Sequence, residues 1–174
     1  MKSTITLSLL ACSLVFTGCG KKEESVSSPG ASPSASTPAA APAPATASAA
    51  NVEVTANDAM KFNVTRFEVA AGQEVKLTLT NMGTMPKAAM GHNLVILKKE
   101  ADAKAFADAA VMAAATDYIP AAKSGDVVAH TKMLGPKQSD QITFKAPTEP
   151  GEYPFLCSFP AHFISGMKGV MVVK

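Results

Sequence analysis

The chain has 174 residues and a formal net charge of +2, with acidic and basic residues interspersed. This length suits one domain, or one domain with a tail. The small net charge argues against an extended polyanion such as nucleic acid as a partner, because phosphate binding needs a concentrated basic face and none is visible. The three cysteines, at positions 12, 19 and 157, are too few for a disulfide framework.

Residues 1–18 have the pattern of a secretory signal peptide: Lys2 supplies positive charge, and the apolar run from Ile5 to Phe16 is too short to span a bilayer. Residues 16–19 read FTGC, which resembles the lipobox of bacterial lipoproteins. In those proteins the signal peptide is cut before the cysteine, and that cysteine is acylated. The resemblance implies lipid on Cys19 and a place in the bacterial cell envelope, and Gly20 is compatible with the outer membrane, facing the periplasm or the cell surface. An ordinary secretory signal with an incidental cysteine is the alternative.

After the cysteine, the segment to Ala50 is rich in Pro, Ala and Ser and has no aromatic residue. It cannot bury enough apolar surface to offset the entropy of ordering the chain. We therefore expect residues 19–50 to be the lipidated cysteine and a disordered tether, and residues 51–174 to form the folded domain.

Short runs of β-type residues separated by turn residues fill most of this domain. The predicted strands are 64–69, 74–80, 94–98, 127–133, 141–144, 152–157 and 169–173. The exception is the segment from Glu100 to Ala115, which is rich in strong helix formers and is followed by Pro120. The pattern predicts an all-β fold, a Greek-key β-sandwich or barrel with one inserted helix.

Three residue types that bind metals lie close together near the C-terminus, in CSFPAHFISGM: Cys157, His162 and Met167. Thiolate and imidazole suit copper, zinc and iron, and a thioether beside them favours redox-active copper. A blue-copper site needs a second histidine. His92 is the candidate because it precedes a predicted strand, and Gly91 beside it lets a backbone carbonyl approach a metal closely. Each residue alone has an ordinary structural explanation, but core packing gives no reason to combine them.

Three segments, MPKAAMGHN, VVAHTKMLGPKQSDQITF and FLCSFPAHFISGMKGVMVVK, resemble those of azurins and auracyanins, members of the cupredoxin family. The likeness covers residues 57–174. It implies a cupredoxin-like fold and one type 1 copper ion, with Asn93 and Phe159 stiffening the ligand loops and His130 not bound to the metal. The ligands that it implies are His92, Cys157, His162, Met167 and, more weakly, the carbonyl of Gly91.

The sequence also departs from azurins. The ligand loop has the spacing C-x4-H-x4-M, one residue longer between histidine and methionine, as in auracyanins. No cysteine lies between Ala50 and Cys157, so the usual azurin disulfide is absent, and Leu94 replaces a common tryptophan.

The pattern favours a membrane-anchored carrier of single electrons, and a copper carrier or delivery module is the alternative. An enzyme is not expected: multicopper oxidases and copper nitrite reductases need more histidine clusters than three histidines provide, and a zinc site leaves Met167 unexplained. We expect the edge of His162 to reach the surface inside an apolar docking patch for redox partners. The residues expected around it include Met82, Met85, Phe163 and Ile164.

Overall fold

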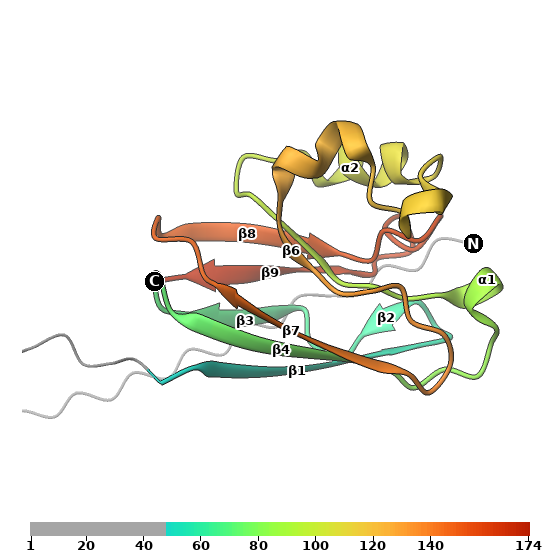
Figure 1. Ribbon diagram of the computed structural model, residues 1–174, viewed down its shortest axis with the longest axis horizontal. Helices are drawn as coiled ribbons and strands as arrows, with labels where there is room; N and C mark the ends of the chain where they lie inside the picture. The colour runs from blue at the N-terminus through green and yellow to red at the C-terminus, as the bar shows by residue number, and fades with distance from the viewer. Residues whose placement is uncertain (1–47) are drawn as a thin grey trace, which may run out of the picture. The chain divides into compact units, whose positions relative to one another are not determined.

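Two β-sheets packed face to face make up the domain in the computed structural model, which describes residues 48–174 (Figure 1). The predicted signal peptide, Cys19 and most of the predicted tether lie outside the described residues. The first strand of the described residues begins at Ala50, beside the expected start of the domain. Among residues 48–174, no helix has the length and apolar character needed to cross a bilayer.

The first sheet has the strand order β2-β1-β4-β7 and the second has the order β3-β9-β8-β5-β6. The first contains β1 (Ala50–Asn57), β2 (Lys61–Phe62), β4 (Glu74–Asn81) and β7 (Ser139–Lys145). The second contains β3 (Arg66–Val69), β5 (Val95–Leu97), β6 (Val127–His130), β8 (Gly151–Leu156) and β9 (Lys168–Val173). Because β1 pairs with β4, and β3 with β9, in parallel, these pairs need crossover connections that a hairpin cannot make. The predicted β-sandwich is confirmed.

Each predicted strand corresponds to an observed one, but the sequence analysis missed β1, β2 and the short helix α1 (Lys87–Met90). The burial of β1 alternates, with Val54 and Ala56 inside the sandwich. Its side-chain alternation is a usable strand signal. The strand was missed because only Val52 and Val54 are large aliphatics in a run that otherwise reads as polar.

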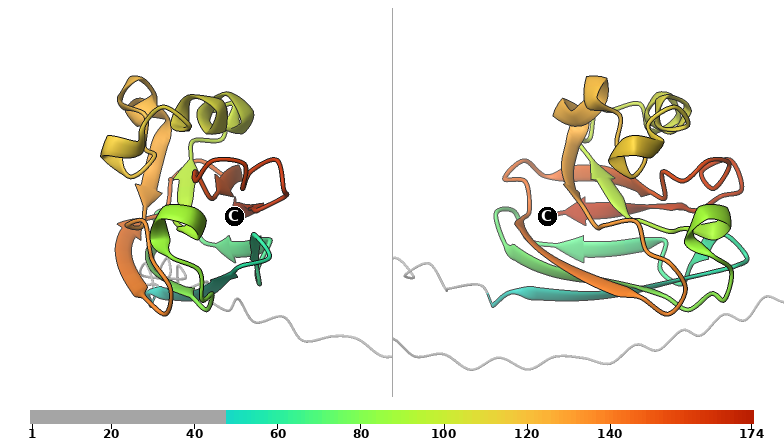
Figure 2. Two further views of the ribbon diagram at one scale, coloured as in Figure 1. Left: turned by 90° about the vertical axis from the view of Figure 1, so that its right-hand side faces the viewer. Right: turned by 45° about the vertical axis from the view of Figure 1, so that its right-hand side comes forward.

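The inserted helix is shorter than predicted: α2 spans Ala103–Ala110 and is followed by two 3-10 turns, η1 (Ala114–Thr116) and η2 (Ala121–Asp126). Asp102 sets its start, because the carboxylate accepts hydrogen bonds from the backbone N–H groups of Lys104 and Ala105, at 2.9 and 3.0 Å. The helix lies outside the second sheet (Figure 2).

Strand β5 is buried on both faces, and this explains why the helix is needed. Leu94 and Ile96 face the core between the sheets, whereas Val95 and Leu97 pack in a second cluster with Phe106 of α2. Without the helix, one face of this strand would expose its apolar side chains to water. The site-bearing sheet is therefore covered on both sides, which holds the ends of β5 and β8 in place.

Candidate metal centre

His92, Cys157 and His162 come together at one end of the sandwich, and all three are buried. Their ligand atoms lie within 4.8 Å of one another. The Cys157 Sγ atom is 3.3 Å from Nδ1 of His162 and 4.0 Å from Nδ1 of His92. Two imidazole nitrogens and one sulfur therefore converge on a single small volume, as the sequence analysis predicted for these three residues.

Local backbone pairing fixes His92. Its N–H donates to the Leu134 carbonyl at 3.1 Å, and the Leu134 N–H donates back to the His92 carbonyl at 2.8 Å. This two-way bridge ties the segment before β5 to the segment after β6. The ring therefore sits on paired backbone and not on a free loop.

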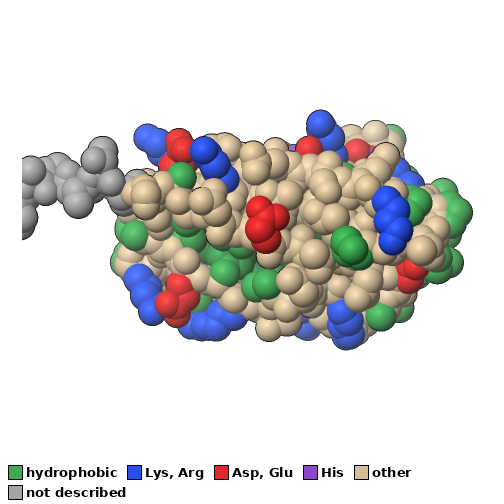
Figure 3. All heavy atoms as spheres, turned by 90° about the horizontal axis from the view of Figure 1, so that it is seen from below, with side chains coloured by type: hydrophobic (Ala, Val, Ile, Leu, Met, Phe, Trp, Pro, Cys, Tyr) green, Lys and Arg blue, Asp and Glu red, His purple; other side chains and the backbone are tan. Residues whose placement is uncertain are grey.

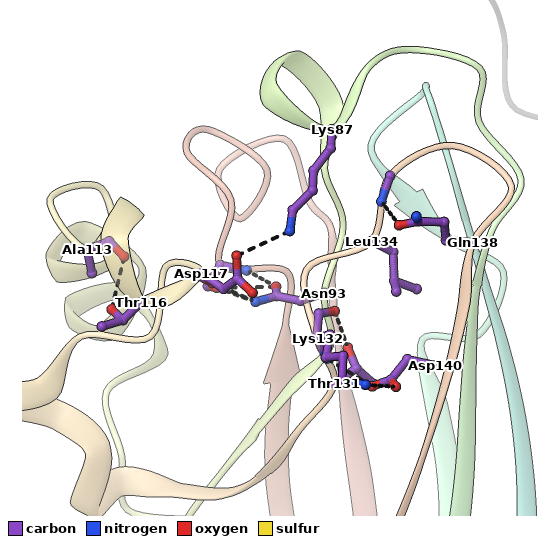
Figure 4. Close-up of polar contacts among 12 residues, drawn as sticks. Lys87, Asn93, Ala113, Thr116, Asp117, Thr131, Lys132, Leu134, Gln138 and Asp140 are labelled. Atoms are coloured by element: carbon purple, nitrogen blue, oxygen red, sulfur yellow. Dashed lines mark hydrogen bonds and ion pairs between the residues drawn. The ribbon is translucent and has the colours of Figure 1, made fainter.

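Asn93 joins the two ligand-bearing segments. Its Oδ1 accepts from the Ser158 N–H at 2.9 Å, and its Nδ2 donates to the Ser158 hydroxyl at 2.8 Å, with both residues buried. His92 and Cys157 are the immediate neighbours of this pair in sequence, so the amide holds both ligands in a fixed relation. Figure 4 shows Asn93 within this network of polar contacts. Ser158 was missed from sequence, because a serine has no metal chemistry and its role appears only through Asn93.

The ligand loop from Cys157 to Met167 folds back on itself. The Cys157 N–H donates to the Met167 carbonyl at 3.1 Å, and the Met167 N–H donates to the His162 carbonyl at 3.0 Å. From outside the loop, Nζ of Lys61 donates to the Ser165 carbonyl at 2.5 Å. These bonds hold the two ends of the loop together.

The other two expected ligands lie beside this cluster. Met167 is fully buried and belongs to the same apolar core cluster as Cys157. The carbonyl oxygen of Gly91 is 4.0 Å from Cys157 Sγ. The Gly91 carbonyl is therefore near the converging ligand atoms, and Met167 is joined to Cys157 through its backbone carbonyl.

Burial controls the protonation of the cysteine. It raises the pKa of the Cys157 thiol to about 12, while the backbone N–H groups of Asn93 and Phe159 act in the opposite direction. A buried thiolate without a nearby cation is costly, so the thiol of the metal-free protein keeps its proton at neutral pH. A bound metal ion would supply the missing positive charge.

Burial acts on the two histidines in the opposite sense and keeps them neutral. It lowers the pKa of His162 to about 4, with a smaller contribution from His92. Burial also lowers the pKa of His92, against the opposing effects of Asp58 and the Asn57 carbonyl. Neutral imidazole is the form that binds metals. Nε2 of His92 is buried and has no hydrogen-bond partner of normal geometry among the described residues. This donor set, one sulfur and two neutral imidazole rings, fits copper.

The expected surface around the site is only partly as predicted. The His162 residue is just 2% exposed, so at most a thin edge of the ring meets solvent. Met82, Met85 and Ile164 are exposed. Phe163 is half-buried: it packs against the second core cluster, and the Lys168 ammonium lies 4.4 Å from its ring centre.

Comparison with known proteins places this site in a family. Residues 48–174 match the family model described as copper binding proteins, plastocyanin/azurin family. Outer membrane protein H.8 of Neisseria meningitidis is 46% identical over 113 residues, which are 63% of this chain and 60% of that protein. The chain thus spans about three fifths of the length of the H.8 proteins that it matches. Azurin of Alcaligenes faecalis is 38% identical over 126 residues, 70% of this chain and 95% of that azurin.

Among solved structures, dithionite-reduced auracyanin from Roseiflexus castenholzii superposes with a TM-score of 0.64 at 38% identity, covering 71% of this chain and 96% of that one. Auracyanin A from Chloroflexus aurantiacus superposes with a TM-score of 0.63 at 28% identity, covering 72% and 99%. The family match, these relatives and the histidine–cysteine–histidine cluster agree. The chain belongs to the plastocyanin/azurin family of copper-binding proteins, as an azurin-like cupredoxin whose cofactor is one type 1 copper ion.

Proposed function

We propose that this protein carries single electrons between redox partners through copper held by His92, Cys157 and His162. The thioether of Met167 and, more weakly, the Gly91 carbonyl would be further ligands of the copper. The observation that carries the proposal is the convergence of one sulfur and two imidazole nitrogens within 4.8 Å in a buried, hydrogen-bonded frame. When bound, copper takes up and releases one electron.

The residues of the chain contribute rigidity. The Leu134 bridge, the Asn93–Ser158 bonds and the loop closure at Met167 fix the ligands before any metal arrives. A frame that does not rearrange between oxidation states keeps the reorganisation energy of electron transfer small. This rigidity favours a carrier that keeps its metal over a module that gives it away.

Docking of partners is assigned to an apolar patch, defined as Met82, Met85 and Ile164, with Phe163 contributing from its half-buried position. Seen from below, hydrophobic side chains gather at the end of the molecule that carries α1 (Figure 3). Ile164 is 76% exposed and lies two residues after the ligand His162. An apolar patch of this kind suits short-lived contacts with redox proteins.

We further propose that the protein is a lipoprotein of the cell envelope, cleaved after residue 18 and acylated on Cys19, with residues 20–50 as the tether of the domain at 51–174. We propose the outer membrane as the location of the protein. The FTGC segment supports this, as does the likeness to outer membrane protein H.8. More than one acyl chain on the cysteine gives stable anchoring, whereas a single chain binds marginally.

Visible absorption and EPR of the copper-loaded protein test the site. An intense blue thiolate-to-copper band with a narrow copper hyperfine splitting is expected, and Cys157→Ser should lack both. Repeated reduction and reoxidation with the copper retained supports electron transfer. Loss of copper on reduction, with transfer to an acceptor protein, would instead make this a copper delivery module.

Electron exchange with a redox protein tests the patch. Ile164→Asp should slow the exchange and leave the blue band unchanged, because the added charge opposes apolar docking. Met112→Asp is the matched control, since Met112 is 90% exposed on the segment after α2. Equal rates in the two variants would remove the patch from the proposal.

Metabolic labelling with a fatty acid in bacterial cells tests the anchor. The full chain should take up label and follow the outer membrane on fractionation, and Cys19→Ala should do neither. An unlabelled, freely soluble wild-type protein would show that residues 1–18 are an ordinary secretory signal.

A further inference from the structure

A series of aromatic rings in tilted contact leads outward from His92 and His162. The ring of His162 lies 4.9 Å, centre to centre, from that of His92 and 4.7 Å from that of Phe159. The Phe159 ring in turn lies 5.1 Å from that of Tyr118. All three separations are within the range of direct aromatic contact. Tyr118, which the sequence analysis left without a role, is thus the outer end of a series of rings that begins at His92 and His162.

The backbone at Tyr118 has an unusual conformation. Asp117 and Tyr118 have φ angles of 51° and 62°, in the left-handed region that residues other than glycine seldom adopt. The turn is held from several sides: the Tyr118 N–H donates to the Ala113 carbonyl at 2.9 Å, and Asn93 Nδ2 donates to the Asp117 carbonyl at 3.4 Å. Two consecutive residues in this region persist only where surrounding contacts fix them.

The same turn is tied to α1 and to the metal site. The Asp117 carboxylate lies 3.3 Å from Nζ of Lys87. Figure 4 shows Asp117 between Lys87 and Asn93, so one side of the turn meets α1 and the other meets the residue that joins the ligand loops. The orientation of the Tyr118 ring is therefore set by the same network that positions His92 and Cys157.

The Tyr118 ring borders a shallow pocket of about 310 Å³. Its lining includes Lys87, Asp117, Tyr118, Met133 and Phe159. None of the residues of the apolar patch lines this pocket, so the surface at Tyr118 is a separate approach to the site. His162 itself is almost wholly covered.

We propose that Tyr118 and Phe159 form a lateral electron path to His162, and that Tyr118 is a positioning residue that brings this path to the surface. The inference rests on the proposed electron-carrier function. A one-electron redox protein at this surface loses one electron and copper(II) gains it; no bond forms or breaks and no proton moves. The rings serve as a bridge and are neither oxidised nor reduced.

Ring contact, and not the hydroxyl, carries the effect. Electronic coupling falls steeply across empty gaps, and aromatic rings in contact shorten the gaps between a surface donor and His162. Phenylalanine at position 118 should therefore keep the path, whereas leucine should break the contact with Phe159.

A ruthenium photodonor attached to a surface histidine tests the path in the full, copper-loaded chain. Ala114→His places the label at the pocket, because Ala114 lines it and is exposed. This variant also carries His130→Gln to remove the exposed natural histidine. The comparison protein keeps Ala114 and is labelled at His130. Flash photolysis gives the rate of electron transfer to copper from each label.

With the label at position 114, Tyr118→Leu should slow transfer by about an order of magnitude, and Tyr118→Phe should leave it unchanged. With the label at His130, neither substitution should matter. With the label at position 114, equal transfer rates in the Tyr118 protein and in Tyr118→Leu would overturn the proposed path. Equal slowing by Tyr118→Leu with the label at position 114 and with the label at His130 would also overturn it. Transfer from neither label would overturn the electron-carrier function as a whole.

Two further readouts separate the path from simple structural damage. In the copper-free protein, NMR should show direct contacts between the rings at positions 118 and 159, and their absence would overturn the proposal. The EPR spectrum and reduction potential of Tyr118→Leu should match those of the wild type. A changed spectrum would show that Tyr118 supports the ligand geometry and would overturn its assignment as part of an electron path.

Discussion

Gly91 is the residue whose side chain, a single hydrogen, most directly shapes the site. A Cβ atom at this position would lie 2.8 Å from the Lys87 carbonyl oxygen and 2.9 Å from Sδ of Met133. Both distances are shorter than real Cβ contacts allow, and one of the two atoms belongs to the backbone. The chain therefore needs glycine here to bring α1 and Met133 close to the metal ligands.

Gly91→Ala should lower the free energy of unfolding by about 1–3 kcal/mol, the usual effect of overpacking. It should also broaden or shift the EPR signal, because His92 is the next residue. Urea unfolding of the copper-free protein and EPR of the loaded protein measure the two effects. Gly125→Ala is the control, since a Cβ there meets no atom within 4 Å. Equal stability of the two variants would contradict this account.

At this scale the sequence predicted the cluster of His92, Cys157 and His162 but missed the residues that support it. Cys157, His162 and His92 were recognised because thiol and imidazole have distinctive chemistry at a recognisable spacing. Ser158, Lys61 and Tyr118 have no such distinctive chemistry. Their roles come from contacts between segments far apart in the chain, so no local pattern could reveal them.

Helix α2 illustrates how an element secures the site from a distance. Its Phe106 is fully buried against β5 and β8, the strands that lead from His92 and into Cys157. Phe106→Ala should reduce the free energy of unfolding by about 3–5 kcal/mol, from lost burial and the cavity left behind. Met112→Ala, with its side chain 90% exposed, should change it little. Urea unfolding measures both, and a small loss for the phenylalanine variant would mean that α2 is dispensable.

The start of the same helix gives a prediction about pH. Hydrogen bonds from the N–H groups of Ala105 and Lys104 lower the pKa of Asp102 below its ordinary value of 3.8. The carboxylate therefore stabilises the folded state above that pH, and the contribution is lost as the pH falls through the lowered pKa. Asp102→Asn keeps a capping side chain without a titrating group.

Unfolding temperatures measured between neutral and acid pH test this prediction. The stability of the wild type relative to Asp102→Asn should be constant near neutral pH and fall below about pH 3.8, the unperturbed value. A difference between the two proteins that does not change with pH would show that the cap acts without its charge.

The bounds of a strand were predicted well where apolar and polar residues alternate along its whole length. Strand β4 alternates apolar and polar residues throughout, and its predicted bounds nearly match Glu74–Asn81. The helix was predicted too long because the alanine-rich segment around 111–115 has high helix propensity. The chain instead forms a 3-10 turn at Ala114–Thr116, where the Thr116 hydroxyl bonds the carbonyls of Ala113 and Ile119. Propensity describes what a segment favours alone, and here the chain turns after Ala110, with the Ala113 N–H donating to the Ala110 carbonyl at 2.9 Å.

For the whole molecule, copper and folding should be coupled. The ligands come from segments beside β5, β8 and β9, so one ion joins parts of the second sheet that are distant in sequence. Because the unfolded chain has no preformed site, the loaded protein should unfold at a higher temperature. The gain is about 2.7 kcal/mol when free copper is one hundred times the dissociation constant.

Differential scanning calorimetry before and after metal removal measures this gain. Cys157→Ser should show a much smaller rise on adding copper, because its site lacks the thiolate. Similar rises in the two proteins would place the stabilising copper somewhere else on the chain.

The direction in which β1 runs has a practical consequence. The strand starts at Ala50, and its other end, at Asn57, lies close enough to His92 to affect its protonation. Eight residues of extended chain cover about 26 Å. Lys174 pairs with Ala71 at the same end as Ala50, opposite the ligands (Figure 1). If the domain were fixed to an electrode through a linker before Ala50 or after Lys174, its copper end would face the solution. The copper would then be accessible to soluble reactants but far from the electrode. Direct current to the electrode should therefore be weak unless the attachment point is moved to the α1 end.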